Sequence, residues 1–196
     1  MSQKGRLIGM LSVIVATEGI ERTAVATLAS LVAGAAAGVV REVILVDRSG
    51  NDVIERVADV AGCAFLRFEG SRPAALAAGA RQARSPWLMF LHAGAVLDAS
   101  WIEEATQFVE GVAASGQPRA GIFRYARSPY AQSGWRDSLV SVLRTLKGDT
   151  EQGLLIARDH YDRLGGHDEG RSEATLVRQL GRSSRTLLRS RVILAA

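Results

Sequence analysis

Polar residues that could contact a ligand stand at the ends of three short apolar runs in the first half of the chain. They are Thr17 and Glu18 after the first run, Asp47 after the second and His92 after the third. Carboxylates and hydroxyls there can accept hydrogen bonds from a ribose or a base. Ligands of open α/β sheets bind beyond the carboxyl ends of the strands, so these residues predict a nucleotide site. The alternative for Asp47 is a turn or helix cap, a common role of Asp.

Bringing these residues together requires a parallel sheet, and the apolar pattern predicts one. Strands are predicted at residues 11–16, 42–47, 64–68 and 87–92, and helices at 21–33, 53–60, 74–83 and 101–114. The first helix carries Val25, Leu28, Ala29 and Val32 on one face, at amphipathic spacing. Four strand–helix units in succession are typical of a doubly wound, mostly parallel α/β sheet.

The second half of the chain has a less regular pattern. Strands are predicted at residues 121–125, 153–157 and 186–194, and helices at 138–146 and 172–180. The sequence contains no internal repeat, low-complexity tract or convincing linker, and 196 residues suit one domain. We therefore predict a single domain over residues 1–196.

Composition limits the class of protein and its partners. Apolar residues make up 47% of the chain, enough for a sizeable core, and the formal net charge is only +4. The arginines are spread along the chain, so we expect no nucleic-acid partner. Cys63 is the only cysteine, which excludes an internal disulfide and predicts a reducing, cytoplasmic location. Neither a signal peptide nor a transmembrane segment is predicted.

Five arginines near the C-terminus form a separate basic group. They are Arg178, Arg182, Arg185, Arg189 and Arg191. A solvated basic face is the plainest interpretation. The alternatives are contact with a diphosphate and peripheral contact with an anionic membrane surface.

Several common nucleotide and hydrolase motifs are absent from the sequence. No Gly-x-Gly-x-x-Gly follows the first predicted strand, and no Gly-x-x-x-x-Gly-Lys-Ser/Thr loop occurs. No Gly-x-Ser-x-Gly nucleophile elbow is present either. These absences argue against dinucleotide enzymes, phosphate-loop NTPases and α/β-hydrolases.

Four segments resemble, in the right order, motifs of the family 2 glycosyltransferases. Residues 11–18 resemble the opening strand, 42–52 the second strand and its nucleotide-binding turn, 83–93 the strand before a metal-binding acidic motif, and 152–169 the acceptor-side strand and Gly-Gly-Phe-Asp-Glu turn. The Leu-His-Ala element at 91–93 is similar to a short bacterial subgroup grouped with arsenosugar-biosynthesis glycosyltransferases. The resemblance implies a GT-A, nucleotide-diphospho-sugar transferase fold.

The resemblance also implies roles for single residues. Glu18 and Asp47 would contact the nucleoside with Asp52 nearby, and Thr17 and His92 complete the expected nucleotide site. On the acceptor side, Glu151 and Gln152 match the last two residues of a Gly-Asp-Gln element, with Glu for Asp.

Binding of a divalent metal is expected to be weak or absent. Gly94 stands where the family has a metal-coordinating Asp, and glycine supplies none of the hard oxygen ligands that Mg²⁺ or Mn²⁺ needs beside a diphosphate. Asp98 lies four residues further along the chain. His92, His160 and His167 have no ligand spacing, so no metal-binding residue is assigned.

Glu173 is the predicted catalytic base. Residues 172–180 align without a gap on the family's Glu-Asp-x-x-Leu-x-x-x-Leu helix, which puts Glu173 on the general-base Asp. Glutamate can deprotonate a hydroxyl, although its extra methylene moves the carboxylate. The alternative is a solvated glutamate in a first helical turn.

The resemblance predicts inverting transfer of a sugar from a nucleoside-diphosphate sugar to an acceptor hydroxyl. Because Gly94 and Glu173 depart from the family pattern, a second hypothesis is a degenerate fold that binds a nucleotide or a protein and turns nothing over. A third is an unrelated doubly wound binding module, since a fold does not fix a function.

Overall fold

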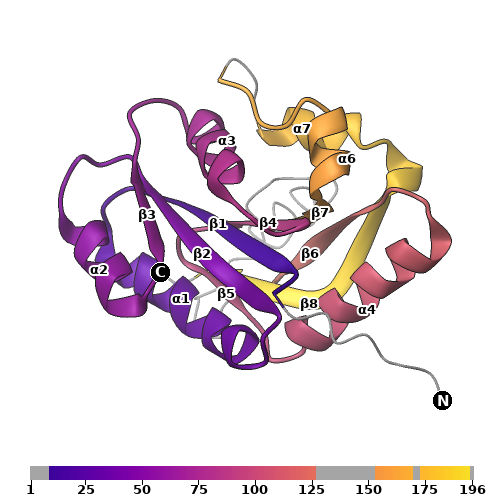
Figure 1. The fold of residues 1–196 in the computed structure, drawn as a ribbon, viewed down its shortest axis with the longest axis horizontal. Coiled ribbons are helices and arrows are strands. Elements are labelled where there is room, and N and C mark those ends of the chain that lie inside the picture. Colours follow the sequence, from indigo (N-terminus) through magenta and orange to yellow (C-terminus); the bar gives the residue numbers. More distant parts are fainter. Residues whose placement is uncertain (1–8, 127–152, 170–172, 195–196) are drawn as a thin grey trace, which may run out of the picture.

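The computed structural model describes residues 9–126, 153–169 and 173–194. They form one sheet of eight strands in the order β3-β2-β1-β4-β7-β6-β8-β5 (Figure 1). The strands are β1 Leu11–Thr17, β2 Val40–Asp47, β3 Ala64–Arg67, β4 Trp87–His92, β5 Ala95–Leu97, β6 Ala120–Ala126, β7 Leu154–Ala157 and β8 Arg185–Leu194. Parallel pairing joins β1 to β2 and β4, β2 to β3, and β6 to β8, whereas β7 runs antiparallel to both its neighbours and β5 antiparallel to β8.

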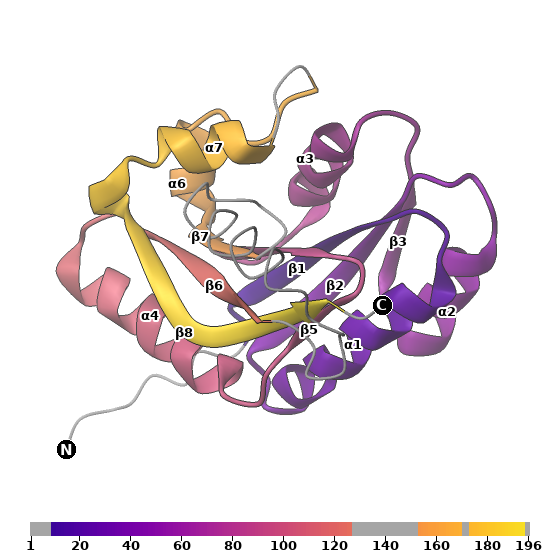
Figure 2. The same ribbon diagram turned by 180° about the vertical axis from the view of Figure 1, so that it is seen from behind.

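Helices cover both faces of this sheet, as the two opposite views show (Figures 1 and 2). The helices α1, α2 and α4 lie on one face, and α3, α6 and α7 lie on the other. Their bounds are α1 Glu21–Ala36, α2 Val53–Ala61, α3 Arg72–Gln82, α4 Trp101–Ser115, α6 Arg158–Arg163 and α7 Glu173–Gln179, and a 3₁₀ turn spans Arg182–Ser184.

Two apolar clusters, one on each face, hold the layers together. Leu31, Ile54 and Trp101 belong to the cluster under α1, α2 and α4, whereas Leu76 and Tyr161 belong to the cluster under α3 and α6. The central strands β1, β4 and β7 are largely apolar, and β1 has seven buried residues in succession. A sheet buried on both faces requires such runs.

Close packing of α1 depends on one glycine. A Cβ on Gly34 would lie 2.4 Å from the ring of Trp101, so only glycine lets α1 approach α4 this closely. Trp101 is buried, and its indole N–H donates to the carbonyl of Ser30 one turn earlier in α1. This contact joins α1 to α4, next to Val40 at the start of β2.

The predicted fold class is confirmed: the chain is a mixed α/β sheet, mostly parallel, with helices on both faces. Two short elements, β5 and α6, were not predicted from the sequence. The helix predicted at 138–146 lies outside the described residues. None of the helices in the described ranges is long and apolar enough to span a bilayer.

Candidate functional site

Strand register brings three of the predicted residues to one edge of the sheet. Thr17 at the end of β1 is the partner of Asp47 at the end of β2, and His92 at the end of β4 is the partner of Ala16. The carboxyl ends of β2, β1 and β4 therefore lie side by side. Ligands of doubly wound sheets bind at this edge, so we use the name strand-end crevice for these three strand ends and the loops that follow them.

The carboxylate of Asp47 joins the loops after β1 and β2. Its Oδ1 accepts the hydroxyl of Thr17 at 2.8 Å and the backbone N–H of Gly19 at 2.9 Å. Its Oδ2 accepts the hydroxyl of Ser49 at 2.6 Å and the backbone N–H of Ser49 at 3.2 Å. Asp47 is fully buried, so these bonds replace the water that its charge would otherwise require. The Asp47 network thus fixes the loops after β1 and β2 relative to each other at the strand-end crevice.

Glu18 forms an ion pair across the crevice instead of standing free. Its Oε1 accepts a hydrogen bond from Nη1 of Arg48 at 2.8 Å, and Nε of Arg48 donates to the carbonyl of Gly70 at 2.9 Å. Arg48 therefore connects the loops after β1, β2 and β3. Pairs this exposed contribute about 0–1 kcal/mol, so a ligand could displace either partner at small cost.

The carboxylate of Asp52 lies at the end of β3, next to the strand-end crevice. Its carboxylate pairs with Arg67 at 2.7 Å, and the same guanidinium pairs with Glu55 at 2.9 Å. Asp52 and Glu55 belong to the start of α2, and Arg67 ends β3. Asp52 and Glu55 raise the pKa of the Arg67 guanidinium, mainly through its hydrogen bond to Asp52. Asp52 is therefore bound to protein, one strand beyond Asp47.

The loop after β4 is held by Thr27 of α1. The backbone N–H of Gly94 donates to Oγ1 of Thr27 at 2.9 Å and to the carbonyl of Thr23 at 3.0 Å. His92 is half-buried, with Nδ1 2.7 Å from the carbonyl of Ala93. Gly94 has a φ of 96°, a backbone conformation that residues with a Cβ rarely adopt.

The described residues do not fit a divalent metal at this loop. Gly94 has no side chain, and the nearby acid Asp98 is used structurally: its Oδ1 accepts from Ser100 and its Oδ2 from the backbone N–H of Arg191. Across residues 9–126, 153–169 and 173–194, no three His, Cys, Asp or Glu side chains converge as ligands.

A second polar cluster lies on the opposite side of β4, around Tyr161 of α6. The backbone N–H of His167 donates to the Tyr161 hydroxyl at 2.9 Å, and that hydroxyl lies 3.0 Å from Nδ1 of the same histidine. Phe90 stacks on Tyr161 with ring centroids 5.1 Å apart. Burial raises the pKa of Tyr161 to about 12, so this phenol stays protonated at neutral pH.

This cluster closes the turn that resembles the acceptor-side motif. A Cβ on Gly166, where φ is 63°, would lie 2.8 Å from the Tyr161 ring. After Gly166 the chain runs back toward the strand-end crevice. Its Glu169 reaches the loop after β3, where Oε1 lies 3.6 Å from the point that a Cβ on Gly70 would occupy. Arg81 and Arg158 line a cavity of about 230 Å³ beside the turn.

Three further residues were predicted to belong to the site: Glu173, Glu151 and Gln152. Glu173 is the first residue of α7. Glu151 and Gln152 lie outside the described residues. The roles predicted for all three stay predictions.

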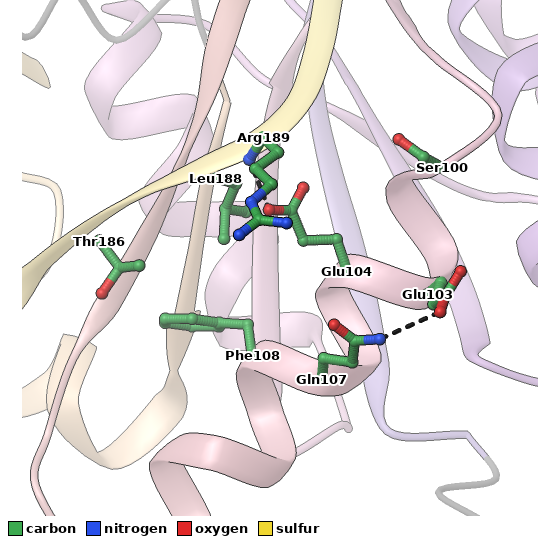
Figure 3. A pocket seen from close by; sticks show the side chains of 8 residues that line it. All are labelled: Ser100, Glu103, Glu104, Gln107, Phe108, Thr186, Leu188 and Arg189. Carbon is green, nitrogen blue, oxygen red and sulfur yellow. Dashed lines mark hydrogen bonds between the residues drawn. The ribbon is translucent and has the colours of Figure 1, made fainter.

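A larger cavity, of about 500 Å³, lies between α4 and β8, on the face opposite α6 (Figure 3). Glu104 stands in it next to Arg189 and accepts the backbone N–H groups of Arg189 and Ser190 and the Ser190 hydroxyl. Burial acts to raise the pKa of Glu104, but these hydrogen bonds hold it below its usual value. Glu104 therefore attaches α4 to β8, and this cavity is separate from the strand-end crevice.

The strand order, the helices on both faces and the strand-end crevice define a GT-A fold, the nucleotide-diphospho-sugar transferase type. Among solved structures, the chain is similar to residues 1–349 of S. aureus TarS, with a TM-score of 0.63 and 13% identity over 94% of this chain and 57% of that one. TarS in complex with UDP-GlcNAc gives a TM-score of 0.66 at 12% identity over 95% of this chain and 59% of TarS.

A third similar structure is glucosyl-3-phosphoglycerate synthase from Mycobacterium tuberculosis in complex with Mn²⁺, UDP and glucosyl-3-phosphoglycerate. It gives a TM-score of 0.61 and 16% identity over 98% of this chain and 72% of the synthase. The chain thus spans 57–72% of the lengths of these solved chains. No family model matches the sequence. No curated protein matches it either.

Sequence reasoning missed two residues that organise the site. Arg48 directly follows Asp47, and a basic residue at one strand end with Glu18 at the next was a signal for an ion pair. Tyr161 gave no comparable signal, because its partner His167 is reached only through the turn at Gly165 and Gly166.

Proposed function

We propose that the chain binds a nucleoside-diphosphate sugar at the strand-end crevice and transfers the sugar to an acceptor hydroxyl with inversion. The observation that carries the proposal is the alignment of Thr17, Asp47 and His92 along one edge of a GT-A sheet. TarS and the mycobacterial synthase, which share this fold, bind UDP-GlcNAc and UDP. Membership of family 2, of its arsenosugar-related subgroup, and a cytoplasmic location are parts of the same proposal.

The crevice offers both kinds of hydrogen-bonding group that a nucleotide needs. Glu18 supplies an acceptor that is two-thirds exposed, and Arg48 a donor with a full positive charge. The Asp47 network keeps the loops that carry them in a fixed arrangement before the ligand arrives. Such preorganisation reduces the ordering cost of binding.

In the proposed reaction, Glu173 removes the proton of the acceptor hydroxyl as its oxygen attacks the anomeric carbon. The new carbon–oxygen bond forms on the face opposite the leaving group, and the bond to the diphosphate breaks with its electron pair. The diphosphate gains charge, which arginines in the crevice, such as Arg48, would compensate. No step is assigned to a metal, because the residues around Gly94 do not fit one.

Nucleotide binding is the first test. Calorimetry with UDP, GDP, ADP and CDP, with and without Mn²⁺, should give micromolar affinity for one diphosphate. Thr17→Val removes a hydroxyl that Asp47 accepts and should weaken that binding, whereas Thr106→Val on α4 should leave it unchanged, because Thr106 bonds only within its helix. If no nucleoside diphosphate binds at millimolar concentration, the proposal fails.

Catalysis is tested separately through Glu173. A general base contributes about 10²–10⁴-fold to rate, and Glu173→Gln keeps the size while removing the basicity. We expect the variant to lose most transfer and to keep donor affinity. Equal activity of the two proteins would remove Glu173 from the mechanism and leave the donor site intact.

A second candidate is a nucleotide-binding module without turnover. The observation that favours it is the loop at Gly94, which has no side chain able to bind a metal. Its φ of 96° also disfavours any residue that carries a Cβ. A chain that binds a nucleoside diphosphate yet neither transfers nor hydrolyses any matching sugar donor would favour this module over the enzyme.

A further inference from the structure

An apolar groove runs between α1 and α2, which lie side by side in both views (Figures 1 and 2). Its volume is about 380 Å³. The residues that line it are mostly apolar: Val25, Leu28, Ala29 and Val32 from α1, and Val53, Val57, Val60 and Ala61 from α2. Glu21 and Arg56 are its two charged members. We refer to these ten residues as the valine groove.

Exposure of large apolar side chains concentrates at this groove. Val25, Val32 and Val60 are 47%, 64% and 92% exposed, and Ile20, next to α1, is 54% exposed. Of the residues that the structure describes, only one other large apolar side chain, Leu187 on β8, is comparably exposed. Single exposed apolar residues are ordinary, but a contiguous patch marks an interaction surface.

The fold of the chain itself does not need this apolar surface. Helix α1 buries a different stripe, composed of Ala24, Thr27, Leu31 and Gly34. The valine face has the i, i+3, i+4, i+7 spacing that normally turns toward a core. Leu28 and Val57 reach the core in part, whereas the valines beyond them face outward. The amphipathic pattern of α1 is therefore only partly used within the chain.

The two charges of the groove are complementary to each other. Glu21 and Arg56 carry opposite charge, and neither forms an ion pair with any residue in the described ranges. A surface that holds both an acid and a base can pair with a copy of itself about a two-fold axis. Each glutamate then meets the arginine of the other copy, twice in one interface.

We propose that the occupant of the valine groove is a second copy of this chain, in an isologous dimer that packs α1 and α2 of each copy together. The exposed valines supply the apolar centre, and the Glu21–Arg56 pairs fix the register at its rim. Thr17, Glu18, Asp47 and His92 are not among the groove residues, although Glu21 and Val53 begin the helices that follow β1 and β2. This inference does not rest on the proposed function.

Sedimentation equilibrium of the whole chain tests the proposal. At about 100 µM, where a micromolar dimer is nearly complete, the mass should approach twice the 20.9 kDa of the chain. Val32→Glu and Val60→Glu should each weaken the dimer at least about tenfold, because they bury an unpaired charge. Leu187→Glu, which adds the same charge at an exposed apolar site on β8, should leave the mass unchanged.

A charge exchange distinguishes this dimer from any other contact. Glu21→Arg and Arg56→Glu should each weaken association, since like charges then meet across the two-fold axis, and the double variant should restore it. Circular dichroism confirms that each variant is folded. A wild-type chain that sediments as a monomer overturns the proposal, and so does a dimer that both valine variants and both charge variants leave intact.

Discussion

The hydroxyl of Thr17 donates to Oδ1 of Asp47 at 2.8 Å, between the last residues of two neighbouring parallel strands. The same oxygen accepts the backbone N–H of Gly19, so one buried carboxylate fixes the chain where β1 leads into α1. Both Asp47 oxygens are occupied by protein donors. Asp47 therefore influences a bound ligand indirectly, by holding in place the loops after β1 and β2.

Asp47→Ala should lower the free energy of unfolding by about 3 kcal/mol, because the buried hydroxyl of Thr17 and the part-buried donors of Gly19 and Ser49 lose their charged acceptor. Nucleotide affinity should fall at least about tenfold as the loops lose their arrangement. Denaturant titration and calorimetry measure the two effects.

Asp52→Ala is the matched control for Asp47. Its carboxylate is exposed and pairs only with Arg67, so we expect a loss within about 1 kcal/mol. Equal destabilisation by the two variants would show that the Asp47 network does not hold the crevice together.

Gly94→Asp restores a carboxylate to the loop after β4 but should not produce a metal site. A residue with a Cβ at a φ of 96° costs about 1–3 kcal/mol. We expect a lower melting temperature and no Mn²⁺ binding by calorimetry. The same change at Gly111, in α4 with open space at its Cβ, should be nearly neutral. Tight Mn²⁺ binding by Gly94→Asp would show that this loop fits a metal once a carboxylate is present.

Glu104→Ala should destabilise the chain by about 1–2 kcal/mol, because β8 loses its acceptor on α4. The pKa of Glu104 is lowered in the folded state, so this contribution is present above about pH 4.5 and is lost as the pH falls further. Glu103→Ala, one residue earlier and bonded only to Gln107, is the control. Thermal melts at pH 7 and pH 3 should differ by less for Glu104→Ala than for the control.

Acid should also act through His160 of α6, which is buried with Nδ1 unpaired within the described chain. Burial, followed by the charge of Arg163, lowers the pKa of His160 below 6.5. The unfolded chain then binds the extra proton first, so stability falls as the pH drops below about 6.5. His160→Gln should flatten this part of the curve. Arg163→Gln should raise the pKa of His160 in an NMR titration, and an unchanged pKa would exclude the electrostatic cause.

The first half of the fold followed from the sequence because its signals are local. The strands predicted at 11–16, 42–47, 64–68 and 87–92 agree with β1 to β4 within about two residues, since each is an apolar run between polar turns. The three-residue strand β5 gave no such signal, because its pairing depends on β8, far along the chain. The apolar face predicted for α1 at Val25, Leu28, Ala29 and Val32 faces mostly outward instead, since periodicity reveals a stripe but not what covers it.

The site was predicted in position but not in its contacts. Strand ends placed Thr17, Asp47 and His92 on one edge, as expected for parallel strands. Which side chains pair there depends on loop geometry: Glu18 reaches Arg48, and Asp52 reaches Arg67 on the far side of β2. Their predicted roles in nucleotide binding remain predictions, to be tested with the variants above.

The place of β8 in the sheet has a consequence for biosynthesis. It lies between β6 and β5, and it is the only neighbour of β5 in the described sheet. About ninety residues separate Leu97 from Arg185, so a ribosome that adds 5–20 residues per second needs roughly 5–18 s to supply the missing strand. During this interval β1 to β4 can already pair with one another. In contrast, β5 and the face of α4 that carries Glu104 have no partner until β8 has been synthesised. A chaperone that binds the nascent chain would meet an open sheet edge at β6 and an uncovered α4.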